Sequence, residues 1–325
     1  MTRVGAVAIG RNEGERLRRC LTSLLQQIAR VVYVDSGSRD DSVAVAQSLG
    51  VKVVVLDTSA PFSAARARNA GFDALLAEED LDYVQFIDGD CGVETGWIDA
   101  ARETLDEDLT IGIVTGWRTE LAPDRNIYHA MSEVEWHRPA GDIRACGGDL
   151  MVRVEAFRAA GGFDASLVVS EDEEFCLRLT RRTGLRVHRV PRVMTHHDIH
   201  MSRFGQWWQR QVRTGHGYAE VGGLYPDHFW RERLRVLVYG LVLPLLGLGS
   251  IVAAEWWLLA VVGLAYVLNW ARTAAGLRRA TGLRMGNALH QAAYLTLSKL
   301  PNIQGMSIFY ARQMRGAPKH LIEYK

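Results

Sequence analysis

The sequence has little of several features that mark common protein classes. It contains 4 cysteines in 325 residues, widely spaced and without a Cys-x-x-Cys pair. That spacing argues against a zinc site or a disulfide framework and suits reduced thiols in a cytosolic compartment. The formal net charge is only +1, so the overall charge gives no reason to expect a nucleic-acid partner. No basic and apolar leader precedes the strand-like run at 4–9, and we expect no cleaved signal peptide.

The first 225 residues alternate between two kinds of pattern. Short apolar, β-rich runs occupy 4–9, 31–34, 51–56 and 83–87, and segments with leucine or alanine at helical spacing lie between them at 13–27, 40–49 and 64–79. Such alternation predicts an α/β fold whose sheet is mostly parallel and covered by helices on both faces.

Two long apolar segments follow. Residues 236–254 contain no charge, Glu255 interrupts, and 256–271 are again uncharged. Each is near the short end of what ~30 Å of hydrocarbon requires, so we interpret them as a transmembrane helical hairpin; a buried core helix is the alternative for either segment alone. Arginines precede the first segment and follow the second, which predicts that both flanks are cytoplasmic and that Glu255 marks an outer turn. The tail from 285 to 315 mixes apolar and basic residues and is expected either on the membrane surface or packed on the globular part.

The strongest local signal for chemistry is Asp88-Gly89-Asp90, at the end of the strand-like run 83–87. Open α/β sheets bind their ligands at such strand ends. Two carboxylates one residue apart can share a hard divalent cation, and that cation can bind a diphosphate. The alternative is a polar turn, in which Asp and Gly are common.

Three further segments of the first half offer binding groups. The strand-to-helix loop from Ile9 to Glu13 can present backbone amides to an anion or a nucleoside. Asp35 ends the second strand, where a carboxylate can bind a base or a ribose, or simply stabilise a turn. Arg66 and Arg68 suit phosphate, and are otherwise solvated helix residues.

Two segments lie further along the chain. Gly147-Gly148 indicates a close backbone approach or a positive φ. Glu171-Asp172 opens a helix, where a general base or a capped helix start is expected. Because a helix N-terminus stabilises a carboxylate, a base there would rely on positioning more than on raised basicity.

Taken in order, these segments resemble the family 2 glycosyltransferases, inverting enzymes with the GT-A nucleotide-diphospho-sugar transferase fold, in a membrane-anchored form of the bacterial exopolysaccharide type. The resemblance covers roughly residues 4 to 200. It implies Asp172 as catalytic base and Asp90 as a metal ligand. The implied donor-binding residues are Ile9, Asn12, Glu13, Asp35, Arg68, Asp88 and Gly89; Gly148 and Glu171 fall on the acceptor side.

The chain departs from the family pattern at two places. Ser36 stands where the family often has a second Asp that can contact the base, which leaves the base of the donor open. Processive synthases carry Gln-x-x-Arg-Trp, and the stretch 206–211 lacks that order, which argues against a processive polymerase. Within this stretch Trp207 and Arg210 are either acceptor-binding residues or part of an interfacial helix that only anchors.

A histidine can complete the metal site in some GT-A enzymes, and the chain offers three candidates in one short segment: His196, His197 and His200. We favour His197; the alternative is that all three are polar loop residues. Mg²⁺ and Mn²⁺ both fit such a site.

The resemblance and the hairpin together predict three parts: a GT-A domain over 1–225, a transmembrane hairpin over 226–272 and an amphipathic juxtamembrane cytoplasmic tail over 273–325. The expected activity is that of a metal-dependent hexosyltransferase at the inner membrane, with its catalytic domain facing the cytoplasm. It would transfer one sugar from a nucleotide-diphospho-sugar to a polyprenyl-diphosphate-linked glycan in cell-surface polysaccharide biosynthesis. The alternatives are a polyprenyl-phosphate glycosyltransferase that makes a lipid-monophosphate sugar donor, and a non-catalytic membrane scaffold.

Overall fold

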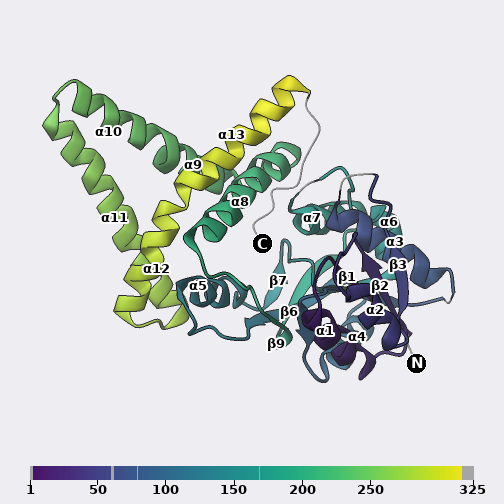
Figure 1. The fold of residues 1–325 in the computed structure, drawn as a ribbon. Helices are drawn as coiled ribbons and strands as arrows, with labels where there is room; N and C mark the ends of the chain where they lie inside the picture. The colour runs from purple at the N-terminus through teal and green to yellow at the C-terminus, as the bar shows by residue number, and fades with distance from the viewer. Residues whose placement is uncertain (1–2, 60–61, 79, 168, 317–325) are drawn as a thin grey trace. The chain divides into compact units, whose positions relative to one another are not determined.

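The computed structural model describes residues 3–59, 62–78, 80–167 and 169–316, which fall into two compact units (Figure 1). One unit contains the chain up to Arg125 together with Ser132–Ile199, and the other contains Asn126–Met131 and the chain from His200 onward. The boundaries expected at residues 225 and 272, between the GT-A domain, the hairpin and the tail, stay a prediction.

The first unit is built on a nine-stranded sheet. Its strands are β1 (Val4–Gly10), β2 (Val31–Asp35), β3 (Lys52–Val55), β4 (Tyr83–Asp88), β5 (Cys91–Val93), β6 (Ile111–Glu120), β7 (Gly141–Ile143), β8 (Leu150–Arg153) and β9 (Arg186–His197). Their order is β3-β2-β1-β4-β8-β6-β9-β5, and β7 also pairs with β9. The predicted α/β class is confirmed, and β1 to β4 are parallel to one another. The short strands β5, β7 and β8 are antiparallel to their neighbours.

Helices cover both faces of this sheet, as predicted. They are α1 (Glu15–Leu25), α2 (Ser42–Ser48), α3 (Ala64–Leu76), α4 (Trp97–Glu107), α6 (Val154–Ala160) and α7 (Glu171–Thr183); α5 (Ile127–Trp136) belongs partly to each unit. Because side chains alternate along a strand, Ala6 and Ala8 face the core under α1 and α4, whereas Val7 and Ile9 face the core under α3, α6 and α7.

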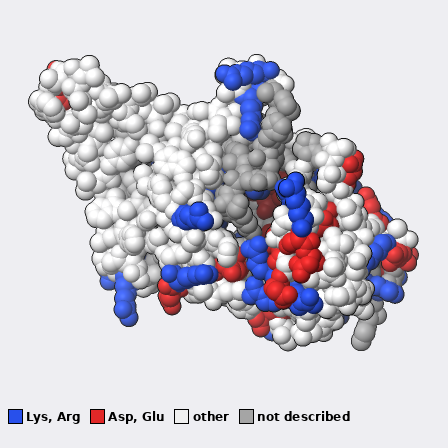
Figure 2. All heavy atoms as spheres, in the orientation of Figure 1, with Lys and Arg blue, Asp and Glu red and all other residues white. Residues whose placement is uncertain are grey.

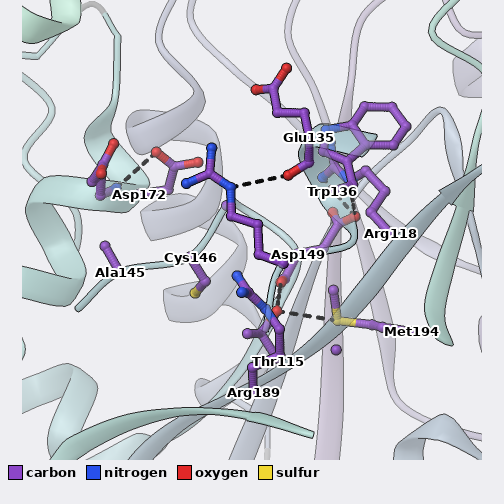
Figure 3. Close-up of a pocket in the computed structure, with 14 residues that line it drawn as sticks. Thr115, Arg118, Glu135, Trp136, Ala145, Cys146, Asp149, Asp172, Arg189 and Met194 are labelled. Atoms are coloured by element: carbon purple, nitrogen blue, oxygen red, sulfur yellow. Dashed lines mark hydrogen bonds and ion pairs between the residues drawn. The ribbon is translucent and has the colours of Figure 1, made fainter. Parts of the chain in front are cut away.

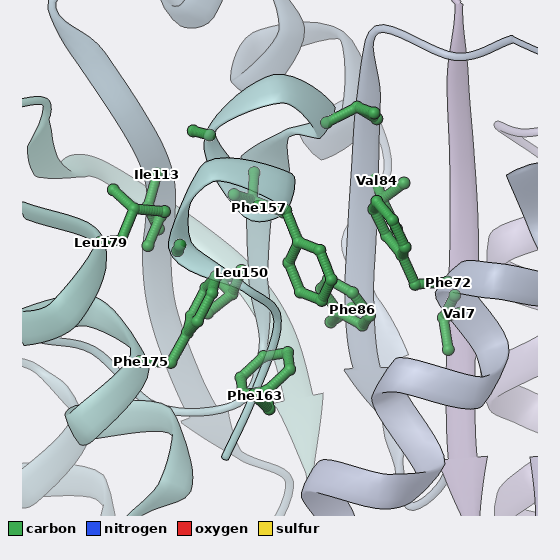
Figure 4. Packing of buried hydrophobic residues seen from close by; sticks show 14 of the residues in the cluster. Val7, Phe72, Val84, Phe86, Ile113, Leu150, Phe157, Phe163, Phe175 and Leu179 are labelled. Atoms are coloured by element: carbon green, nitrogen blue, oxygen red, sulfur yellow. The ribbon is translucent and has the colours of Figure 1, made fainter. Parts of the chain in front are cut away.

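The core under α3, α6 and α7 is rich in phenylalanine (Figure 4). Phe72 and Phe157 stack with ring centroids 4.0 Å apart, and Phe163 and Phe175 lie 4.3 Å apart. These contacts connect α3 and α6 with the start of α7, so they hold the helix that carries Asp172 against the sheet.

The second unit is helical. Its elements are α8 (Phe204–Leu224), α9 (Trp230–Leu237), the π-helical segment η1 (Val238–Val242), α10 (Leu243–Val252), α11 (Trp256–Thr281), α12 (Met285–Leu297) and α13 (Lys299–Arg315). Helices α8 and α13 pack closely at two glycines: a Cβ on Gly215 would lie 2.6 Å from the carbonyl carbon of Asn302, and one on Gly305 would lie 2.7 Å from the amide nitrogen of His216. The end of the described tail therefore packs on α8 as a helix.

Two helical stretches are long and apolar enough to cross a membrane, judged by length and composition. The run α9–η1–α10 spans Trp230–Val252, with a mean hydropathy of 1.9, and α11 spans Trp256–Thr281, with a mean hydropathy of 1.4. Only 22% and 11% of their apolar windows are buried, which is unlike the core helix of a soluble protein. In the face shown in Figure 2, the region of α10 and the first part of α11 is almost free of charged side chains. The turn between them contains Glu255, where the sequence predicted it.

Candidate active site

The carboxyl ends of β1, β2 and β4 meet at one edge of the sheet. In the strand register Gly10 is the partner of Asp35, and Ile9 is the partner of Asp88. The amide of Gly89 donates a hydrogen bond to the Ile9 carbonyl at 2.7 Å, and a Cβ on Gly89 would lie only 3.0 Å from that oxygen. The register therefore brings together three of the segments that the sequence singled out.

Asp35 is buried and already accepts three hydrogen bonds. Its carboxylate accepts from the amides of Gly37 at 3.0 Å and Ser38 at 2.9 Å, and from the Tyr33 hydroxyl at 3.0 Å. This is the turn-stabilising role that the sequence left open. A contact of Asp35 with a nucleoside stays a prediction.

Asn12 and Glu13 connect the loop after β1 to the loop after β2. Asn12 has a positive φ of 57°, its amide donates to Ser38 Oγ at 2.9 Å, and its side-chain oxygen accepts from the Arg39 amide at 2.8 Å. The Glu13 amide donates to Ser42 Oγ at 3.1 Å. Both residues shape the edge of the sheet at the carboxyl ends of β1 and β2, where the donor is expected to bind. Their contact with a donor stays a prediction.

Arg68 is a buried bridge rather than a solvated helix residue. Only 3% of its side chain is exposed, and its guanidinium donates at 2.8 Å both to Asp88 and to Glu171. A Cβ on Gly148 would lie 2.6 Å from Arg68 Cζ and closer still to Nη2, so only glycine fits beside this guanidinium. Arg68 thus connects the end of β4 to the first residue of α7, and its phosphate-binding role stays a prediction.

Sequence reasoning missed two members of this network, Arg118 on β6 and Asp149 immediately before β8. Asp149 is 2% exposed; it accepts from the Asp88 amide at 3.0 Å and from Arg118 Nη2 at 2.7 Å. Arg118 Nη2 also lies 3.3 Å from Asp88 Oδ2. Burial would raise the pKa of Asp88, but the nearby Arg68 and Arg118 guanidinium groups outweigh it and hold that pKa below its ordinary value. Asp88 therefore stays ionised.

The structure places Asp90 and His197 side by side. The pairing of β5 with β9 sets Cys91 opposite His197, and His197 Nε2 lies 3.2 Å from Asp90 Oδ2. Both side chains are about 5% exposed. Of the other two histidines, His196 instead pairs with Glu94 at 2.6 Å, and His200 belongs to the second unit.

These residues fit a divalent cation. Ligand atoms of Asp90, Cys91 and His197 all lie within 4.8 Å of one another, and His197 Nδ1 is buried without a hydrogen-bond partner. A carboxylate oxygen and an imidazole nitrogen suit Mn²⁺, and the carboxylate suits Mg²⁺ as well. Burial raises the pKa of the Cys91 thiol, and soft sulfur ligands do not suit hard cations such as Mg²⁺ and Mn²⁺.

Asp172 lies in the first turn of α7, after Ser170, whose φ is 57°. Its Oδ1 accepts a hydrogen bond from the Glu173 amide at 2.8 Å. Burial, then the neighbouring Glu171 carboxylate, raises the pKa of Asp172 to about 7, although Arg68 opposes the shift. The sequence predicted a base that relies on its position more than on a raised pKa. In the structure, burial beside another carboxylate outweighs the pKa-lowering effect of the helix N-terminus. Asp172 therefore combines a fixed position with a raised pKa.

Asp172 lines a cavity of about 310 Å³ in the first unit (Figure 3). Asp149, Arg118 and Trp136 line the same cavity. The ring of Trp136 meets His197 edge-to-face at 4.9 Å. The cavity therefore joins the residue expected as base to the Asp88–Asp149 network and lies next to the Asp90–His197 pair.

Trp207 and Arg210 lie on α8, in the second unit. Trp207 is 1% exposed and packs against Phe204 at 5.2 Å and Tyr294 at 5.1 Å. Packing accounts for this tryptophan, and the acceptor-side role of both residues stays a prediction.

The α/β sheet, the acidic residues at its strand ends and the carboxylate on α7 agree with the GT-A fold that the sequence resembles. The family model described as glycosyl transferase family 2 matches residues 7–164, and the model described as glycosyl transferase family group 2 matches residues 143–278. The two matches together span residues 7–278 and place this part of the chain among the family 2 glycosyltransferases.

Among curated proteins, the chain is similar to a pre-mycofactocin glycosyltransferase of Mycobacterium tuberculosis, with 28% identity over 235 residues that cover 67% of this chain and 47% of the relative. It is also similar to a TPR repeat-containing protein of Synechococcus elongatus, with 31% identity over 44% of this chain and 34% of the relative. The chain thus spans less than half the length of these curated relatives.

Two solved structures share the fold. A mannosyltransferase from Pyrobaculum calidifontis, in complex with GDP-Man and Mn²⁺, superimposes with a TM-score of 0.59 at 15% identity, covering 95% of this chain and 87% of that one. The fragment 1–349 of TarS from S. aureus, in complex with UDP-GlcNAc, superimposes with a TM-score of 0.53 at 14% identity, covering 97% and 93%. At these identities the likeness shows the GT-A fold.

Proposed function

We propose that this protein is a membrane-anchored, inverting glycosyltransferase that transfers one sugar from a nucleotide-diphospho-sugar to a hydroxyl of a polyprenyl-diphosphate-linked glycan. The observation that carries the proposal is the bridge through Arg68. It connects Asp88, at the donor-side edge of the sheet, to Glu171, the residue before Asp172. Donor-side and base-side groups are thereby held in one rigid network, as a reaction between two bound substrates requires.

The reaction needs a proton acceptor and a stabilised leaving group. As the new bond forms between the acceptor oxygen and the anomeric carbon, Asp172 takes the hydroxyl proton, a step worth roughly 10²–10⁴ in rate. The bond from the anomeric carbon to the diphosphate oxygen breaks, and its electron pair leaves with the nucleoside diphosphate. One displacement inverts the anomeric centre and needs no protein nucleophile. The raised pKa of Asp172 suits this role, because a base works best with a pKa near the working pH.

Asp90 and His197 are the residues we expect to hold a divalent cation. When bound, Mn²⁺ or Mg²⁺ there would supply positive charge to the departing diphosphate. The buried, unpartnered His197 Nδ1 and the 3.2 Å approach of Nε2 to Asp90 support this assignment. The Pyrobaculum mannosyltransferase, solved with Mn²⁺ and GDP-Man, gives independent reason to test Mn²⁺ first.

The membrane-spanning hairpin supports a lipid-linked acceptor. Arg231, Arg233 and Arg235 lie at the start of the first span, and Arg278 and Arg279 lie at the end of α11. By the positive-inside rule both ends are cytoplasmic, where nucleotide-sugars are available to the site. Polyprenyl phosphate is the alternative lipid acceptor. The curated relative is named for a different acceptor, pre-mycofactocin, so the acceptor must be tested separately from the donor.

The test is a donor screen on the detergent-solubilised full chain. UDP-, GDP- and dTDP-sugars are supplied with Mn²⁺ or Mg²⁺, with and without membrane lipid extract, and nucleoside diphosphate release is measured. We expect one donor to be hydrolysed slowly without lipid extract and faster with it. Asp90→Ala should abolish hydrolysis under both conditions. The matched control is Asp99→Ala, an exposed acid on α4 that, among the described residues, pairs at hydrogen-bond distance only with its helix neighbour Arg102. Absence of release from every donor would contradict the proposal.

Bare polyprenyl phosphate and polyprenyl-diphosphate-linked sugar, supplied separately with the active donor, then identify the acceptor. Transfer only to the sugar-bearing lipid supports the proposed function, and transfer only to the bare phosphate supports the alternative. Release of nucleotide without transfer to either lipid would contradict the lipid-linked acceptor.

A further inference from the structure

The cavity beside Asp172 contains an arginine without a counter-charge. Arg189 of β9 lines this cavity, as Figure 3 shows, and its Nη1 donates to the Pro139 carbonyl at 3.2 Å. Its Nε is buried without a hydrogen-bond partner. Among the described residues, no carboxylate pairs with Arg189. A half-buried guanidinium left in this state is costly, and buried polar groups in native proteins nearly always have partners.

The unpaired edge of the Arg189 guanidinium has a geometry that selects its ligand. With Nη1 held by a carbonyl, Nε and Nη2 remain as two parallel donors. That edge of a guanidinium matches two oxygens of one carboxylate or phosphate. The bond to Pro139 also fixes the plane of the fork, so little side-chain entropy would be lost on binding an oxyanion.

The other charged groups of the cavity leave this cation unbalanced. Arg118 is already paired with Asp88 and Asp149. Arg138 also lines the cavity; its Nε donates to the backbone carbonyl of Glu135, and no described carboxylate pairs with it. Burial lowers the pKa of Arg189; the smaller opposing influence of Cys146 does not offset it, and the proximity of Arg138 lowers the pKa further.

Acidic side chains also line the cavity, but they are engaged elsewhere. Glu135 and Glu173 have interactions of their own with other groups, and Asp149 is neutralised by Arg118. Asp172, with its pKa near 7, carries only part of a charge at neutral pH. The cavity therefore offers two unmatched guanidinium groups next to the proposed base.

We propose that this cavity is the acceptor site, and that Arg189, assisted by Arg138, binds an oxyanion carried by the acceptor while Asp172 faces its reacting hydroxyl. This inference rests on the proposed function and narrows its substrate class to an acidic acceptor. A volume of about 310 Å³ is at the small end of the range for small-molecule sites, so it suits one sugar unit together with its charged group. The oxyanion is either a phosphate next to the acceptor sugar or a carboxylate of that sugar.

The experiment uses the detergent-solubilised full chain with saturating UDP, GDP, dTDP and Mn²⁺ present, so that donor-side anion sites are filled. Inorganic phosphate and glucuronate are titrated separately by calorimetry. The variants are Arg189→Gln, which removes the charge, and Arg189→Lys, which keeps the charge and loses the fork. Arg192→Gln is the matched control, an exposed arginine on the same strand that does not line the cavity. Circular dichroism confirms that each variant is folded.

We expect one of the two probes to bind the wild type, with affinity roughly 10- to 100-fold weaker in Arg189→Gln, weakened less in Arg189→Lys, and unchanged in Arg192→Gln. Binding of phosphate alone assigns the oxyanion to a lipid-linked phosphate, and binding of glucuronate alone assigns it to an acidic sugar. Absence of binding to the wild type, or equal binding to Arg189→Gln, would overturn the inference. Failure of the proposed function would instead be seen as absence of nucleotide release in the donor screen, which does not depend on this titration.

Discussion

Replacing Gly148 by alanine would place a methyl group where the Arg68 guanidinium lies. The new Cβ would be 2.6 Å from Arg68 Cζ, well inside van der Waals contact. Because Arg68 is 3% exposed and makes 2.8 Å bonds to both Asp88 and Glu171, its guanidinium can retreat only by lengthening one or both of them. A broken ion pair that leaves a buried charge uncompensated costs about 3–5 kcal/mol.

For a unit of this size, each kcal/mol lowers the unfolding midpoint by roughly 2–4 °C. We therefore expect Gly148→Ala to lower the apparent midpoint of the detergent-solubilised protein by roughly 6–20 °C, measured by intrinsic tryptophan fluorescence, and to abolish nucleotide release. The matched control is Gly147→Ala, whose Cβ would lie 3.8 Å from Asp172 Oδ2, an ordinary contact. If the two variants unfold at the same temperature, the Arg68 bridge does not have the structural role assigned to it.

Two further predictions concern the metal and the membrane. Calorimetry should show Mn²⁺ binding to the wild type in the presence of nucleoside diphosphate, and Asp90→Asn and His197→Ala should each weaken it by at least about tenfold; undiminished binding in both variants would place the cation elsewhere. A cysteine at Glu255 should react with a membrane-impermeant maleimide added to intact cells, whereas one at Arg279 should react only after permeabilisation. The four native cysteines are all buried and give little background, and labelling of Arg279→Cys alone in intact cells would reverse the proposed orientation.

Local patterns in the sequence predicted much of the site because strand ends and helix starts have recognisable composition. The run 83–87 followed by Asp88-Gly89-Asp90 is found as β4 and the turn after it, and Glu171-Asp172 opens α7 as expected. Parallel pairing of β1, β2 and β4 then brings the loop after Ile9, Asp35 and Asp88 to one edge.

The rest depended on contacts between distant segments. Asp149 joins the site because β8 inserts antiparallel between β4 and β6, which no periodicity in the chain indicates. Arg118 has no motif around it and is recognised only by its ion pairs to Asp88 and Asp149. The sequence favoured His197 among three histidines, but its position beside Asp90 depends on the β5–β9 register, which sets His197 opposite Cys91.

The raised pKa of Asp172 could not be predicted from the sequence for a related reason. The sequence showed an acidic helix start, where the macrodipole lowers a carboxyl pKa. It did not show that the side chain is partly buried beside Glu171, and this burial together with the Glu171 carboxylate raises the pKa instead.

The most direct test of the account is the pH dependence of kcat/KM for transfer by the wild type, with the donor and acceptor that the screens identify. Asp172 must be ionised to accept a proton, and its pKa in the free protein is about 7. The account predicts that kcat/KM rises about tenfold per pH unit below 7 and levels off above it, and that Asp172→Asn lowers the plateau by roughly 10²-fold or more. A profile that is flat between pH 5 and 8, or an Asp172→Asn variant with near-normal transfer, would contradict the assignment of Asp172 as the base.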